Sequence, residues 1–169
     1  MKVLLSIIFS LLQIAVVFTA YGQSGIGFNS SVLNGLTLTN PTNLAFGPDN
    51  KLYVTQQDGT IFGLTVQKNG PNDYQVTNTE VILLVKNIPN HSDIGQVVTL
   101  TARQITGIVT AGTSTNPILY ICSSDPRIGG GGTLRDLDLD TNSGTISKLT
   151  KNGNTWSMVQ LVQGLPRSE

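Results

Sequence analysis

The sequence is poor in several of the residues that commonly carry chemistry. Its 169 residues include one cysteine, one histidine and one tryptophan, and only 12% of them are charged. A single cysteine, Cys122, excludes an intrachain disulfide, and its position in an apolar run indicates a small buried hydrophobic residue rather than a reactive thiol. Ten Lys and Arg balance ten Asp and Glu. This balance indicates no nucleic acid or other polyanion as partner.

The first 22 residues have the pattern of a cleavable signal peptide. Lys2 precedes the apolar run from Val3 to Phe18, and Ala20-Tyr21-Gly22 supplies small residues for cleavage before Gln23. A membrane-spanning helix is the alternative, since the run approaches the ~17 to 25 residues that a span needs. No basic cluster follows it, so we expect no stable membrane anchor and a secreted, periplasmic or extracellular protein. Residues 23–35 are then a linker.

The rest of the chain indicates an all-β fold, because no long segment keeps a helical period. Short apolar runs alternate with turn residues such as Gly47-Pro48-Asp49-Asn50, and residues 68–73 are interpreted as a longer loop. The expected strands of a first four-stranded antiparallel unit are Thr42–Phe46, Lys51–Thr55, Thr60–Val66 and Glu80–Val85.

A second unit of the same kind begins about sixty residues later. Asn152-Gly153 is a hairpin signal between its last two strands. The expected strands are Ile105–Val109, Pro117–Cys122, Gly144–Thr150 and Trp156–Val162. Repeated four-stranded sheets are typical of β-propeller blades, and a β-sandwich is the alternative.

Two stretches resemble a known family. The segment from Asn40 to Leu64, NPTNLAFGPDNKLYVTQQDGTIFGL, is similar to blade openings of the soluble glucose/sorbosone dehydrogenases and, more loosely, of NHL-type propellers. The stretch from Gly131 through Gly144, followed by Gly164-Leu165-Pro166-Arg167-Ser168-Glu169, resembles the second blade of a secreted, mostly bacterial branch of that family. The resemblance implies a partial propeller domain over residues 36–169, with one blade at about 40–86 and another at about 103–165.

The resemblance also implies a function for a longer parent protein. Members are six-bladed propellers, and some bind pyrroloquinoline quinone and oxidise sugars. Their catalytic histidine follows the Leu-Pro-Arg-Ser stretch, so we expect it beyond Glu169. The catalytic and quinone-binding residues therefore stay unassigned, and the isolated chain is predicted to be inactive and to expose blade edges and apolar faces. The alternatives are a non-catalytic propeller that binds carbohydrate or protein, and a small β-sandwich adhesin.

An acidic stretch is the candidate metal site. Asp136, Asp138, Asp140 and Asn142 offer oxygen ligands at alternate positions, and Gly144 follows them. Such spacing predicts a calcium loop, although alternating Asp and Leu also describes a strand with one wet face.

Three further features are weaker candidates. His91 lies between Asn90 and Ser92 with Asp93 nearby, but a triad within three consecutive residues rarely has the required geometry, so we interpret it as a surface-loop residue. Gly129–Gly132 lacks the Lys and Ser of a phosphate loop and is interpreted as a flexible loop. In the enzyme hypothesis, this loop and Arg127 overhang the substrate mouth.

Overall fold

The fold was analysed in a computed structural model of the chain, which describes residues 27–92, 94–127 and 141–167. The predicted signal peptide and Asp136, Asp138 and Asp140 lie outside these residues. The chain divides into two compact units, residues 1–30 and 31–169, and the fold below is that of the second. Within the described ranges, no helix is long and apolar enough to cross a bilayer.

The regular secondary structure of the described residues consists entirely of β-strands, which confirms the all-β class. The strands are β1 (Leu33–Asn34), β2 (Pro41–Phe46), β3 (Leu52–Gln56), β4 (Ile61–Gly70), β5 (Asp73–Ile82), β6 (Asn90–His91), β7 (Val97–Val98), β8 (Gln104–Gly112), β9 (Pro117–Ser124), β10 (Gly144–Asn152) and β11 (Thr155–Leu165).

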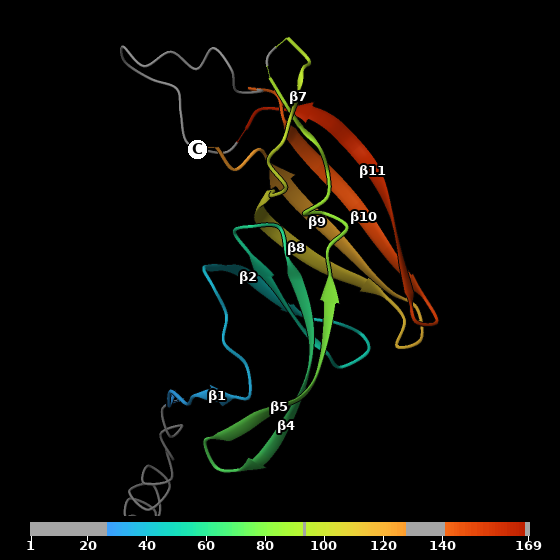
Figure 1. Ribbon diagram of the computed structural model, residues 1–169. Coiled ribbons are helices and arrows are strands. Elements are labelled where there is room, and N and C mark those ends of the chain that lie inside the picture. The colour runs from blue at the N-terminus through green and yellow to red at the C-terminus, as the bar shows by residue number, and fades with distance from the viewer. Residues whose placement is uncertain (1–26, 93, 128–140, 168–169) are drawn as a thin grey trace, which may run out of the picture. The chain divides into compact units, whose positions relative to one another are not determined.

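The first sheet is a curled, mixed sheet in the order β1-β5-β4-β3-β2 (Figure 1). Strands β2 to β5 follow one another in antiparallel succession, as tight turns dictate. The two-residue strand β1 adds to the edge of β5 in parallel, with Leu33 opposite Tyr74.

The second sheet is antiparallel throughout, in the order β11-β10-β9-β8. A short hairpin of β6 and β7 lies in the connection between the two sheets. Each large sheet therefore contains one four-stranded up-and-down unit, as the turn signals predict.

The element boundaries differ from the prediction mainly around the fourth strand. The predicted loop at 68–73 is wrong, because β4 and β5 continue to a tight turn at Pro71-Asn72, where Asn72 adopts a φ of 58°. The ladder then pairs Gly70 with Asp73, and β5 ends at Ile82 rather than Val85. Asparagine tolerates this left-handed conformation, so the hairpin closes without a longer loop.

The main hydrophobic core lies between the two large sheets. Tyr53 and Trp156 meet there edge to face, with ring centroids 6.0 Å apart, an arrangement that aromatic pairs favour. The buried residues of this core are Tyr53, Ile61, Ile82, Val85, Ile88, Ile105, Leu119, Ile121 and Leu149. The two sheets are therefore packed face to face and stabilise one another.

Glu80 joins the two sheets at the border of this core. Its carboxylate accepts hydrogen bonds from Lys51 Nζ at 2.7 Å, from Lys151 Nζ at 2.7 Å and from Trp156 Nε1 at 2.9 Å. Lys51 directly precedes β3 of the first sheet, whereas Lys151 and Trp156 belong to the second sheet. One acidic side chain thus links the two sheets at the border of their shared core.

The opposite faces of the two sheets are covered differently. In the first sheet, Val54, Leu64 and Val76 form a second apolar cluster with Leu33, Leu36 and Leu38 from the segment around β1. In the second sheet, Cys122 is exposed, so the prediction that it is buried is wrong. Its side chain lies on the outer face, and Gly107, its partner on β8, has no side chain to cover it.

Candidate functional site

The two longest connections between strands of the large sheets, residues 83–103 and 125–143, begin and end at the same end of the paired sheets, which we call the long-loop end. In an up-and-down sheet successive connections alternate between the two ends. Tight turns join β2 to β3, β4 to β5, β8 to β9 and β10 to β11, whereas residues 57–60, 83–103 and 125–143 make the other connections. Arg103 N donates to Asp58 O at 3.2 Å, and Arg127 Nη2 donates to His91 O at 2.6 Å. Binding residues are commonly carried on such loops.

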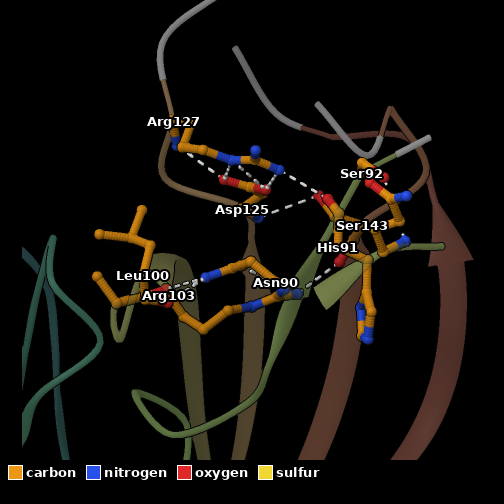
Figure 2. A network of polar contacts seen from close by, with 10 residues as sticks. Asn90, His91, Ser92, Leu100, Arg103, Asp125, Arg127 and Ser143 are labelled. Carbon is orange, nitrogen blue, oxygen red and sulfur yellow. Dashed lines mark hydrogen bonds and ion pairs between the residues drawn. The ribbon is translucent and has the colours of Figure 1, made fainter. Parts of the chain in front are cut away.

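Arg103 is at the centre of the polar network at this end (Figure 2). It is 2% exposed. Its Nη1 donates to Asn90 Oδ1 at 3.0 Å, and its Nη2 donates to Ser143 O. Asn90 Nδ2 in turn donates to Leu100 O at 3.0 Å and to Ala102 O at 2.8 Å. The network therefore ties the connection between the sheets to the start of β10.

Asp125 and Arg127 form the second half of the network. Arg127 Nε donates to both carboxylate oxygens of Asp125, at 3.0 and 2.9 Å, and its Nη2 also contacts this carboxylate. The backbone N–H of Arg127 donates to Asp125 Oδ1 at 2.9 Å, a local turn that Asp commonly makes. Ser143 Oγ accepts from Asp125 N at 3.0 Å.

The environment lowers the pKa of Asp125 below its ordinary value. Burial is the largest influence and by itself raises the pKa, but the hydrogen bonds from Arg127 and the charges of Arg127 and Arg103 outweigh it. The carboxylate therefore stays ionised and holds the loop end by charge-assisted hydrogen bonds.

Several hollows open at the long-loop end, and we call two of them the inner and the outer hollow. The inner hollow, of about 400 Å³, lies beside the starts of β2 and β8, and the outer hollow, of about 170 Å³, lies beside β10 and β11. The inner hollow is lined by Thr39, Asn40, Gln56, Gln57, Asp58, Ala102 and Pro126. The outer hollow is lined by Ile88, Pro89, His91, Arg103, Asn142, Ser143, Thr145, Gln160, Gln163 and Gly164.

Asp58, which lines the inner hollow, forms a charged pair. Lys86 Nζ lies 2.6 Å from Asp58 Oδ2, and Thr60 donates to both oxygens of the same carboxylate. Burial raises the pKa of Asp58, but the contacts with Lys86 and Thr60 outweigh it and lower the pKa to about 2. Beside this pair Asn40 has a φ of 45°, and its carbonyl accepts from Gln57 N at 3.0 Å.

The structure places the predicted site residues only in part. His91 and Asn142 both line the outer hollow. Ser92 Oγ accepts from Gln96 N at 3.1 Å, a contact within its own hairpin. Arg127 is bound to Asp125 at the loop end. Asp93, Gly129–Gly132 and the three candidate aspartates lie outside the described residues.

Sequence reasoning missed Arg103, Asn90, Asp125 and Ser143. Their contacts join residues 13 to 40 positions apart, so no local motif marks them. The one weak sequence signal for the network is Arg103 itself, because a cationic residue stands directly before the predicted apolar strand.

The described residues do not fit a metal or quinone site. They contain no group of three or more His, Cys, Asp or Glu side chains that could hold a metal ion. The carboxylates of pyrroloquinoline quinone require cationic partners, but Arg103 donates to Asn90 and Ser143, and Arg127 donates to Asp125. No chemical step through either group follows from this part of the chain.

The calcium hypothesis for Asp136, Asp138, Asp140 and Asn142 stays a prediction. If the stretch binds calcium, millimolar calcium should raise the melting temperature, since a ligand that binds only the folded state stabilises it. The measurement is thermal unfolding with calcium and with chelator, and magnesium serves as the control ion. An unchanged melting temperature would contradict the predicted calcium site.

Comparison of the chain with models of protein families, with curated proteins and with solved structures finds no match. A functional assignment therefore depends on the arrangement of the sheets and on the residue patterns.

Proposed function

We propose that the two large sheets are successive blades of a secreted β-propeller of the glucose/sorbosone dehydrogenase type. The observation that carries this proposal is the side-by-side position of β2 and β8, the first strands of the two units. Asn43 Nδ2 donates to Thr106 O at 3.2 Å, and Thr110 Oγ1 donates to Phe46 O at 2.7 Å. In a propeller, the first strand of each blade lines the central channel and the sheets pack face to face.

In this proposal the parent protein is a quinone-dependent sugar oxidoreductase, and this chain supplies two blades and part of the loop surface. The loops that carry the Arg103 network and both hollows lie at one end of the blades. In this proposal the catalytic histidine of the family lies outside residues 1–169, so these residues alone should show no dehydrogenase activity.

One observation favours the alternative of a non-catalytic, carbohydrate-binding propeller. The outer hollow is lined by three residues with side-chain amides, Gln160, Gln163 and Asn142. Such groups both donate and accept hydrogen bonds, as sugar hydroxyls require. At about 170 Å³ the hollow is smaller than the ~300 to 1,000 Å³ of drug-sized sites, so one sugar ring is the matching size.

Reading the coding sequence beyond Glu169 tests the propeller. We expect further four-stranded repeats and a histidine in the next segment, and a stop codon directly after Glu169 would contradict the proposal. On the chain alone, dye-linked sugar oxidation with added quinone and calcium should be absent, and robust activity would refute the inactive assignment. If the parent binds sugar without oxidising it, Gln160→Ala and Gln163→Ala should weaken that binding.

A further inference from the structure

Strand β11 leaves one long edge of the second sheet unpaired in the part of the chain that the structure describes. It runs from Thr155 to Leu165, and among the described strands it is hydrogen-bonded to β10 alone. Its sequence, TWSMVQLVQGL, has no charged residue and no proline. Val159 and Leu161 are 61% and 51% exposed. An exposed strand edge presents free N–H and C=O groups that pair readily with another strand.

The other long edges among the described strands are less suited to self-pairing. β1 covers only the start of the outer edge of β5, where it pairs with Tyr74 and Gln75, and the rest of β5 carries the charged residue Glu80. β2 and β8 face one another through the side-chain hydrogen bonds of Asn43 and Thr110. The first sheet thus shows that the outer edge of a unit accepts an added strand.

The usual protections of an edge are weak in the first half of β11. Edges are commonly guarded by lysine, proline, bulges or short length. The bulges in the β10–β11 ladder lie between Gly144 and Ser147 of β10. The pairing from Asn152 opposite Thr155 to Ser147 opposite Gln160 is regular. The segment Thr155–Gln160 therefore has no bulge, charge or proline.

We propose that this edge pairs antiparallel with β11 of a second copy of the chain. Antiparallel pairing of two identical strands has two-fold symmetry, so both copies use the same surface and the assembly closes as a dimer. Like charges that lie opposite each other destabilise a strand pair. Because β11 has no charged residue, two copies of it would pair without such repulsion. The result is an eight-stranded sheet that continues across the two molecules. This inference does not depend on the proposed function, because β11 is an outer strand of the described second sheet whether or not that sheet is a propeller blade.

The test is sedimentation velocity of the purified chain over a wide concentration range, with the variant Ser157→Glu/Val159→Glu. Val159 lies opposite Lys148, so the new carboxylate meets a cation within its own sheet. The control is Thr79→Glu/Val81→Glu, which also introduces two glutamates at exposed positions of the other outer strand, β5, opposite Leu64 and Phe62 of β4 and beyond the two residues that β1 pairs. We expect a concentration-dependent dimer whose dissociation constant rises about tenfold or more in the β11 variant but not in the control.

Amide hydrogen exchange of the unmodified chain gives an independent measurement. Amides within Thr155–Gln160 should exchange more slowly as the protein concentration and the fraction of dimer rise, whereas the exchange rates of the β5 amides should not change. A monomer at every concentration, a dimer that both variants weaken equally, or exchange in β11 that is independent of concentration would each overturn the proposal.

Discussion

Replacing Glu80 by alanine is expected to lower the free energy of unfolding by about 2 kcal/mol, because the substitution leaves two partly buried cations without their shared carboxylate. The Glu80 side chain is 20% exposed, and those of Lys51 and Lys151 are 21% and 13% exposed. Removal also leaves Trp156 Nε1 without its acceptor. Fully buried ion pairs cost more to break, and the partial exposure here reduces the loss.

The effect of Glu80 should depend on pH with a definite sign. Burial is the largest influence and raises the pKa of Glu80, but the hydrogen bonds from Lys151, Lys51 and Trp156 and the charge of Lys51 outweigh it and lower the pKa from 4.5 to about 2. The unfolded chain therefore binds the proton more tightly than the native state does. The stabilisation is fully present above pH 4.5 and is lost as the pH falls towards 2.

Urea unfolding at neutral pH and near pH 3 measures this difference. The gap in stability between the original chain and Glu80→Ala should shrink at the lower pH, while the contribution of Asp58 falls equally in both. Trp156→Phe is the control, since it removes one donor to Glu80 and keeps both lysines, and a smaller loss of about 1 kcal/mol is expected. An equal gap at the two pH values would contradict the electrostatic role of Glu80.

The two four-stranded units were predictable because local turn chemistry sets them. Asn50, with a φ of 61°, and Asn152-Gly153, with Gly153 at 59°, form turns whose conformations their residue types allow. Hydrophobic alternation within the strands then predicted bounds for β2, β3, β8 and β9 that lie within three residues of the observed ones. The hairpin at Pro71-Asn72 was missed because a run of turn residues was interpreted as a longer loop.

The short strands and the polar network were not predictable in the same way. β1, β6 and β7 have two residues each, too few for any periodic signal. β1 exists because β5 supplies its hydrogen bonds and because Leu33 packs on the first sheet. The Arg103 network likewise depends on loops that only the packing of the sheets brings together.

Arg103→Met is expected to lower the free energy of unfolding by about 3 kcal/mol, the cost of leaving buried polar groups without their partner. Methionine fills much of the volume of arginine but donates no hydrogen bond. Asn90 Oδ1 and Ser143 O would each lose a donor, and Asp125 would lose one of the two charges that lower its pKa.

Two further variants separate the causes of this loss. Lys148→Met removes a cation from the outer face of the second sheet and should change stability by no more than about 0.5 kcal/mol. Arg103→Lys keeps the charge but lacks the planar fork that reaches two acceptors, so it should be nearly as destabilising as Arg103→Met. If Arg103→Lys restores full stability, the charge stabilises the loop end and the hydrogen bonds do not. If Arg103→Met is neutral or stabilising, apolar packing replaces the network at no cost, and the role of Arg103 lies in the outer hollow that it lines rather than in folding.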